Sequence, residues 1–184
     1  MKTTGFKKME VWTIVFSLIF ALALTTAEAQ KKFIIAGTGD YTMIEGQVFN
    51  IDDAEGHSLT LNNYEGNNIS TGETEWMHNA RAFNISFNDV TKGNGVHQGY
   101  VTIEKGSDRI VSQWEGKITT ILSEEGKPVT TFRGNMWWTD ATGKYKGMHG
   151  VATYKGWFTS EKTYTVEWEG EFWKKENLSE KMTR

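Results

Sequence analysis

The chain has no cysteine, a single proline and only four histidines among its 184 residues. The lack of cysteine excludes a disulfide framework, thiolate ligands for zinc and a lipid-modified cysteine. A small domain without disulfides has to be held together by its hydrophobic core. The scarcity of proline and the 19 glycines are typical of many strands joined by tight turns.

The histidines, His57, His78, His97 and His149, are not spaced as metal ligands. Neither His-x-His nor His-x-x-x-His occurs, so we predict no metal site. The chain also lacks the Gly-x-Ser-x-Gly motif of a serine hydrolase and a glycine-rich nucleotide loop before a helix. We therefore predict no cofactor, and the sequence leaves open whether the protein is an enzyme.

The sequence also has no long run of residues that carry the same charge. The formal net charge is -3, and lysines alternate with acidic residues along the chain. A mildly acidic protein without a basic cluster has no electrostatic reason to bind nucleic acid or an anionic membrane. A small apolar molecule is therefore the partner that we consider. The sequence does not determine the oligomeric state.

The N-terminus has the pattern of a secretory signal peptide over residues 1–29. Three lysines among the first eight residues precede the apolar run Val11–Leu24, and small residues at Ala27 and Ala29 mark a cleavage site. The alternative is a membrane anchor, but that run of about 14 residues is shorter than the about 20 that a spanning helix needs. We expect a secreted or periplasmic protein with no stable membrane span after cleavage, whose net charge moves from -3 to -4 because three lysines and two glutamates are lost.

The remaining chain fits one domain. Residues 30–174 carry turn residues at intervals typical of an all-β barrel or sandwich, and residues 175–184 form a polar tail. Glycine, asparagine and aspartate predict turns that include Asp52–Gly56 and Gly66–Asn68. The same pattern predicts separate strands over Gly39–Glu45 and Gly46–Ile51, and a later strand over Thr74–Ser86.

The clearest strand pattern lies near the C-terminus. Tyr164, Val166, Trp168 and Phe172 alternate with threonine and glutamate, so the aromatic side chains share one face and the polar side chains share the other. A half-buried antiparallel strand with an aromatic inner face is typical of a closed barrel. We predict an all-β fold, a single antiparallel closed barrel of about eight strands.

The segment Ala141–Gly156, ATGKYKGMHGVATYKG, resembles a glycine- and tyrosine-rich segment of allene oxide cyclase-like barrel proteins, a group that includes exported bacterial proteins. Similar stretches are His97–Lys117 and the aromatic strand that ends at Phe172. The resemblance implies a calycin-like eight-stranded barrel, with dirigent proteins related in fold. Plant members of that group act on unsaturated or phenolic substrates in an apolar cavity. No catalytic residue of the group can be matched to a position in this chain.

Two sets of residues are candidates for a site in such a barrel. In the strand Arg109–Lys117, Ser112, Trp114 and Gly116 share one face, and charged residues share the other. Burial of the charged residues without partners would be very unfavourable, so we expect the face with Trp114 to point into the barrel. The inverted orientation, with the charged set lining a polar cavity, remains an alternative. The aromatic cavity-lining candidates are Trp114, Tyr154, Tyr164, Trp168 and Phe172, and the polar candidates for the cavity or its mouth are His97, Arg109, Gln113, Glu115 and His149.

Three functions follow from this reading. The first is an exported barrel that binds a small apolar molecule in an aromatic-lined cavity. The second is a cyclase or isomerase that folds an unsaturated lipid, terpenoid or phenolic substrate in the same cavity. The third is a structural or interaction protein with a solid core. The sequence favours the first only slightly.

Overall fold

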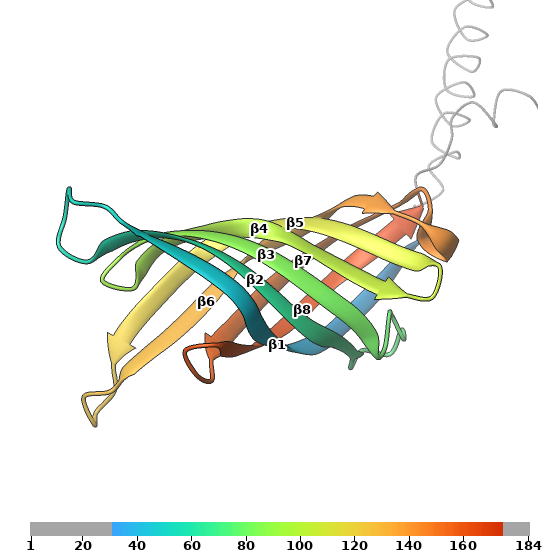
Figure 1. The fold of residues 1–184 in the computed structure, drawn as a ribbon. Coiled ribbons are helices and arrows are strands. Elements are labelled where there is room, and N and C mark those ends of the chain that lie inside the picture. The colour runs from blue at the N-terminus through green and yellow to red at the C-terminus, as the bar shows by residue number, and fades with distance from the viewer. Residues whose placement is uncertain (1–30, 175–184) are drawn as a thin grey trace, which may run out of the picture. The chain divides into compact units, whose positions relative to one another are not determined.

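The structure is a computed structural model and describes residues 31–174. The predicted signal peptide over 1–29 and the predicted tail over 175–184 lie outside the described residues. Within them, eight strands form one closed antiparallel barrel in which each strand pairs with the next and β8 pairs with β1 (Figure 1). The elements are β1 (Lys32–Asn50), β2 (His57–Ser70), β3 (Ala80–Thr91), β4 (Asn94–Lys105), β5 (Asp108–Leu122), β6 (Pro128–Ala141), the short 3-10 helix η1 (Gly143–Tyr145), β7 (Met148–Phe158) and β8 (Thr163–Lys174).

The predicted fold class, a closed antiparallel barrel of eight strands, is confirmed, but several strand bounds differ. The two strands expected around Gly46 are one long strand, β1, whose register with β2 shifts between Met43 and Glu45. The turn expected at Gly66–Asn68 lies inside β2, where a Cβ at Gly66 would overlap the ring of Tyr41. The strand expected from Thr74 begins only at Ala80.

The barrel interior is built from the alternating positions of its strands. In β8, Tyr164, Trp168 and Phe172 are buried, whereas Glu169 between them is exposed. Inward glycines make room for these large rings, because a Cβ at Gly37 of β1 would overlap the ring of Trp168. The chain, which has no cysteine, can therefore close a barrel around aromatic side chains.

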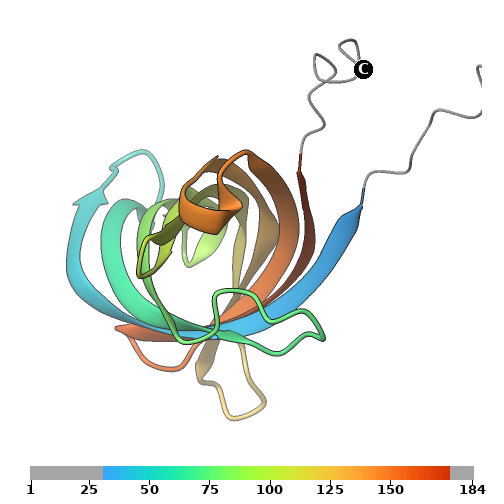
Figure 2. The same ribbon diagram turned by 90° about the vertical axis from the view of Figure 1, so that its right-hand side faces the viewer.

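One end of the barrel is closed by the connection between β2 and β3. This connection places Trp76, which is 2% exposed, against the indole of Trp168 at 5.0 Å and that of Trp138 at 5.6 Å between ring centroids. Asn68 of β2 holds the connection, because its Nδ2 donates to the carbonyl oxygens of Trp76 and Met77 at 3.2 and 2.9 Å. Figure 2 looks onto this end, with η1 and the 71–79 connection in front of the strands.

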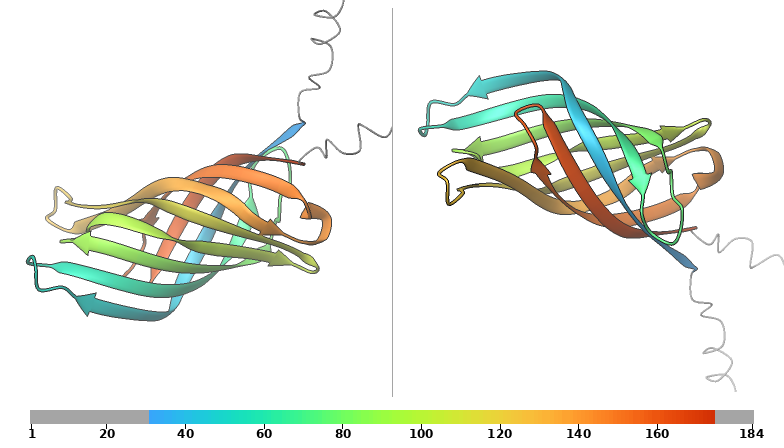
Figure 3. Two further views of the ribbon diagram at one scale, coloured as in Figure 1. Left: turned by 90° about the horizontal axis from the view of Figure 1, so that it is seen from above. Right: turned by 90° about the horizontal axis from the view of Figure 1, so that it is seen from below.

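The opposite end carries the hairpin turns that follow β1, β3, β5 and β7. The β1–β2 and β5–β6 hairpins extend there beyond the rest of the barrel (Figure 3). Val48 and Leu122 in these extensions are largely exposed. Among residues 31–174, no helix is long and apolar enough to cross a membrane.

Strand β3 has an unusual orientation. Its side chains Asn84, Ser86 and Asn88 are buried in the interior, whereas Ile85 is 52% exposed and Phe87 also faces outward. The neighbouring strands impose this orientation, because Asn84 stands opposite both Tyr64 of β2 and Val101 of β4, which are buried. The wall formed by β2, β3 and β4 therefore includes amides on its inward face and large exposed apolar side chains on its outward face. The outward apolar side chains of this wall are Leu61, Ile85, Phe87, Val96 and Tyr100.

Candidate functional site

A cavity of about 80 Å³ lies inside the barrel. Its walls are aromatic on the side of β5 to β8 and rich in amides and hydroxyls on the side of β2 and β3. This volume holds a few water molecules or a few ligand atoms, since water occupies about 30 Å³ in the liquid. The lining residues used below are Tyr41, Tyr64, Trp76, Asn84, Ser86, Asn88, His97, Trp114, Phe132, Met136, Tyr154, Phe158, Tyr164, Val166 and Trp168.

Asn84 connects the two sides of the cavity. Its Oδ1 accepts a hydrogen bond from Nε1 of Trp114 at 2.9 Å, and its Nδ2 donates to the hydroxyl of Tyr164 at 2.7 Å. Buried polar groups are stable when they are paired in this way. Asn84 therefore fixes the orientation of one indole and one phenol that line the cavity.

A second group of amides lies closer to the hairpin end of the barrel. Asn88 Nδ2 donates to Oγ1 of Thr60 at 2.6 Å, and Asn62 Nδ2 donates to the same oxygen at 3.1 Å. Asn88 lines the cavity, and its Oδ1 accepts neither of these hydrogen bonds. The amide side of the cavity thus offers polar atoms beyond those that hold the walls together.

The tyrosines at the cavity are neutral phenols. Burial raises the pKa of Tyr64 to about 12, and burial raises the pKa of Tyr164 well above its ordinary value. The ring of Tyr164 stacks on that of Tyr41 at 4.8 Å and meets the edge of Tyr64 at 4.9 Å. These rings give the cavity flat surfaces and protonated hydroxyl groups.

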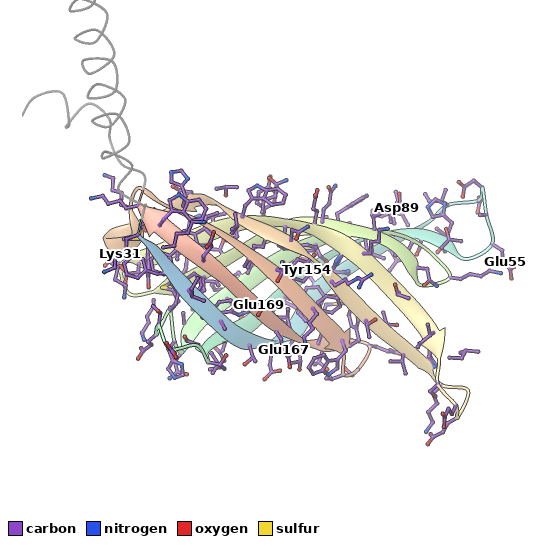
Figure 4. All side chains as sticks on the ribbon, turned by 180° about the vertical axis from the view of Figure 1, so that it is seen from behind. Lys31, Glu55, Asp89, Tyr154, Glu167 and Glu169 are labelled. Carbon is purple, nitrogen blue, oxygen red and sulfur yellow. The ribbon has the colours of Figure 1, made fainter. Side chains whose placement is uncertain are left out.

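His97 and Tyr154 form a hydrogen-bonded pair across two strands that separate them. Nε2 of His97 lies 3.0 Å from the hydroxyl of Tyr154. The register places Gly116 of β5 and Gly134 of β6 between them, directly opposite each other. A Cβ at Gly116 would lie 2.6 Å from the Tyr154 hydroxyl and 2.8 Å from His97 Nε2, so the pair requires glycine there. Tyr154 lies inside the barrel wall (Figure 4).

The electrostatics of this pair follow from its burial. Removal from water lowers the pKa of His97 to about 4, and burial, followed by the charge of Glu115, raises the pKa of Tyr154. Both groups are therefore neutral at pH 7, one as imidazole and one as phenol. Such a pair can exchange a hydrogen bond with a ligand without carrying charge.

Trp76 has the one buried side-chain polar atom without a partner among residues 31–174. Its Nε1 is buried and unpaired, and the residue lines the cavity. An unpaired buried donor is destabilising by about 1–3 kcal/mol. A ligand atom that accepts a hydrogen bond from this indole would remove that penalty.

The structure brings only part of the predicted site together. Trp114, Tyr154, Tyr164, Trp168 and His97 line the cavity. Phe172 is inside the barrel but belongs to the closed end, where it stacks on Trp138 at 5.4 Å between ring centroids.

The other predicted polar residues lie on the outside of the barrel. Arg109 pairs with Glu104 at 3.5 Å, and His149 is exposed and stacks on Trp173 at 6.5 Å between ring centroids. Gln113 and Glu115 share the outward face of β5 with Arg109. The orientation in which these charged residues line the cavity is therefore not the one in the structure, because each would have had to be buried without a partner.

The residues predicted from the sequence did not include Asn84, Ser86, Asn88 or Trp76. In Ala80–Asp89 the larger apolar residues occupy the odd positions, so alternation alone assigns the wrong face to the interior. The one available signal was the pair of small residues Ala80 and Ala82, which share the inward face with Asn84. No group of three or more histidine, aspartate or glutamate residues that could hold a metal ion is found within 31–174.

A second hollow, of about 1210 Å³, lies on the outer surface at the middle of the barrel. It crosses the outward faces of most strands and is lined by charged side chains of β5 to β8. Glu167 and Glu169 of β8 are two of them (Figure 4). This hollow is larger than the interior cavity and has charged side chains in its lining, which the interior cavity does not, so the two differ in chemistry.

The fold and its interior define a closed eight-stranded β-barrel with an aromatic and amide-lined cavity. None of the protein-family profiles compared matches the chain, and no curated protein matches it. Two similar solved structures are of pterocarpan synthase dirigent proteins. The structure of GePTS1 has a TM-score of 0.46 and 10% identity, over 79% of this chain and 92% of that chain. The structure of PsPTS1 has a TM-score of 0.45 and 11% identity, over 80% of this chain and 97% of that chain. This likeness concerns the path of the backbone and says nothing about what the present chain binds.

Proposed function

We propose that this protein is an exported binding barrel that holds a small, flat molecule with hydrogen-bonding groups in its interior. The observation that carries the proposal is the inward face of β3. Asn84, Ser86 and Asn88 face a wall of aromatic rings across a cavity. A barrel that only needed a solid core would place Ile85 and Phe87 inside, because burial of apolar side chains stabilises a fold more than burial of amides does.

The lining defines the chemistry of the ligand. The rings of Trp114, Tyr164 and Trp168 favour a flat, unsaturated molecule. Nε1 of Trp76 offers a donor, and Ser86 and Asn88 add polar atoms on the opposite side. In place of the purely apolar ligand that the aromatic content suggested, we infer a ligand with a carbonyl or hydroxyl group on a ring.

The size of the cavity limits the ligand further. Pockets for drug-sized molecules measure about 300–1,000 Å³, whereas this cavity measures about 80 Å³. A single ring therefore enters only when side chains at the wall move. Phe158, Met136 and Val166 are half-buried lining residues and are the ones that move with least loss of packing. Because Trp76 closes the other end, we place the entrance at the hairpin end.

Isothermal titration calorimetry with 4-hydroxybenzaldehyde and decanoate tests this proposal. The aldehyde is flat and carries both polar groups, whereas decanoate is long and flexible. We expect saturable binding of the aldehyde and much weaker binding of decanoate. Ser86→Leu should abolish aldehyde binding, because its side chain fills the cavity. Ile85→Ser, one residue away on the outer face, is the matched control and should bind as the unmodified protein does.

Two results would contradict the proposal. One is an absence of binding by both compounds, which would favour the structural or interaction protein with a solid core. The other is equal aldehyde binding by the Ser86→Leu variant, which would place the ligand outside the barrel. Export is tested separately, by N-terminal sequencing of the protein recovered outside the cytoplasm, where the expected first residue is Gln30.

A second candidate, an isomerase or cyclase, is favoured by the hydrogen bond between His97 and Tyr154 at the cavity. A neutral imidazole and a neutral phenol at hydrogen-bond distance are groups that general acid–base catalysis uses. This candidate predicts that a bound compound is converted and that Tyr154→Phe retains binding but loses the conversion. Unchanged recovery of every compound that binds would leave the binding protein as the function.

A further inference from the structure

Three cations stand in one row across the outer surface of the barrel. Lys117 of β5 is directly opposite Arg133 of β6, and Arg133 is directly opposite Lys155 of β7. All three face outward and line the outer hollow. Like charges directly opposite each other on neighbouring strands destabilise a sheet. The row therefore has a free-energy penalty in the protein as it stands.

Of the three cations, Lys155 alone has an ion-pair partner within residues 31–174. Lys155 forms an ion pair with Glu167 at 3.0 Å, and this hydrogen bond raises the pKa of Lys155. Neither Lys117 nor Arg133 takes part in an ion pair within residues 31–174. Two adjacent cations thus have no ion-pair partner in the part of the chain that the structure describes.

The nearby carboxylates do not change this. Asp89, which shares the hollow, is bound to Nε2 of His57 at 2.9 Å, and Glu167 is bound to Lys155. Glu115 stands one outward position before Lys117 on β5 and is opposite Asn135, so it faces an amide and not Arg133. The single carboxylate of Glu115 beside two cations leaves an excess of positive charge at Lys117 and Arg133.

Hydroxyl groups complete the surroundings of the pair. The next outward residues on the same two strands are Thr119 and Thr131, which are exposed and directly opposite each other. Two cations and two hydroxyl groups on neighbouring strands are suited to an anion with several acceptor oxygens. The arginine fork binds two of these oxygens at once, and lysine acts as a point charge.

We propose that Lys117 and Arg133, with Thr119 and Thr131, form a surface site for a tetrahedral oxyanion, the sulfate or phosphate group. A group with two negative charges removes the repulsion between the two cations. A carboxylate has one charge and engages the arginine fork alone. The site is separate from the cavity and does not depend on the function proposed for it.

The test uses sodium sulfate and sodium phosphate, with sodium chloride at matched ionic strength as the reference salt. Binding is followed by NMR shifts of the backbone amides of β5 and β6, together with the melting temperature. We expect saturable shifts centred on Lys117 and Arg133 with sulfate or phosphate and none with chloride. An absence of saturable shifts with both anions, combined with an absence of polymer binding as described below, would overturn the proposal.

The variant Lys117→Glu separates the site from a general salt effect. It places a carboxylate opposite Arg133, so it should raise the melting temperature by about 1–3 °C without any added anion and should abolish the response to sulfate. Lys146→Glu changes the net charge equally at an exposed position after η1 and is the control. A Lys117→Glu variant that melts lower than the unmodified protein, or still binds sulfate, contradicts the proposal.

The same chemistry occurs in free anions and in sulfated polymers. Dextran sulfate, compared with uncharged dextran, provides the second arm. Binding of the inorganic anions supports a site for a free or terminal oxyanion. Binding of dextran sulfate alone, lost in Arg133→Gln, supports a site for a sulfated chain. Equal binding of dextran sulfate by the unmodified protein and by Arg133→Gln contradicts the assignment to this row.

Discussion

The indole of Trp114 donates a hydrogen bond to Oδ1 of Asn84 at 2.9 Å, and this bond joins the aromatic wall of the barrel to its amide wall. The same asparagine donates to the hydroxyl of Tyr164 at 2.7 Å. Its two polar atoms are thus both used inside a barrel whose other large side chains are mostly aromatic. The amide of Asn84 therefore holds one indole and one phenol in the interior by hydrogen bonds.

Replacement of Asn84 by leucine leaves the indole of Trp114 without an acceptor. We expect Asn84→Leu to lower the free energy of unfolding by about 1–3 kcal/mol, although leucine is the more apolar residue. Urea unfolding followed by tryptophan fluorescence measures the change. The control is Ile85→Ser, on the exposed face, which should change stability by less than about 0.5 kcal/mol. If Ile85→Ser lowered the free energy of unfolding more than Asn84→Leu does, β3 would have Ile85 inside the barrel and Asn84 outside.

The glycines beneath His97 and Tyr154 give a second prediction. In Gly116→Ala the new methyl group would overlap the Tyr154 hydroxyl and the Arg133 carbonyl oxygen. We expect the free energy of unfolding to fall by about 1–3 kcal/mol. We also expect the pKa of His97, measured from its imidazole NMR signals, to rise toward its ordinary value. Gly106→Asn is the control, because asparagine tolerates the positive φ of this turn and open space surrounds it. A Gly116→Ala variant with unchanged stability and an unchanged His97 pKa would show that the side chains of His97 and Tyr154 do not pack over Gly116.

The buried His97 makes the stability of the fold depend on pH in the acidic range. Its pKa is lowered to about 4 by burial, whereas the unfolded chain has the ordinary value of 6.5. Between these values the unfolded state binds more protons, so stability falls as the pH is lowered from 6.5 to 4. We expect His97→Gln to have a flatter stability profile over this range. Melting temperatures at half-unit pH steps measure it, and parallel profiles for the two proteins would contradict the buried neutral imidazole.

His57 acts in the opposite direction. Its Nδ1 lies 2.5 Å from Asp53 Oδ1 and its Nε2 lies 2.9 Å from Asp89 Oδ1, and the hydrogen bonds to Asp53 and then Asp89 raise its pKa above 6.5. The contribution of this group is fully present below pH 6.5 and is lost as the pH rises through the raised pKa. We expect His57→Gln to lose this alkaline decline and to keep the acid decline that His97 causes. An alkaline decline unchanged by the substitution would exclude the contact with the two carboxylates.

The closed barrel followed from the sequence because the alternation in β8 is unambiguous. Tyr164, Trp168 and Phe172 are separated by threonine and glutamate, and only one orientation buries the rings. The same argument succeeded in β5, where Trp114 is inside and Arg109 is outside. In these strands local pattern and global fold agree.

The amide wall did not follow from the sequence, because local pattern and global fold disagree in β3. Phe83, Ile85 and Phe87 alternate as core residues do, and only the pairing with Tyr64 and Val101 turns them outward. Register between strands is a tertiary property that a single sequence does not state. Trp76 was missed for a related reason, since it lies in a connection and its burial depends on Trp138 and Trp168.

The absence of cysteine from the chain allows the most direct test of the amide-lined interior. Single cysteines are introduced at positions 84 to 87 one at a time, and the rate of labelling by a thiol reagent is measured in the folded protein. The account predicts slow labelling of Asn84→Cys and Ser86→Cys, and fast labelling of Ile85→Cys and Phe87→Cys. Fast labelling at 84 and 86 with protection at 85 and 87 would show that β3 turns its apolar side chains inward and that the cavity has no amide wall.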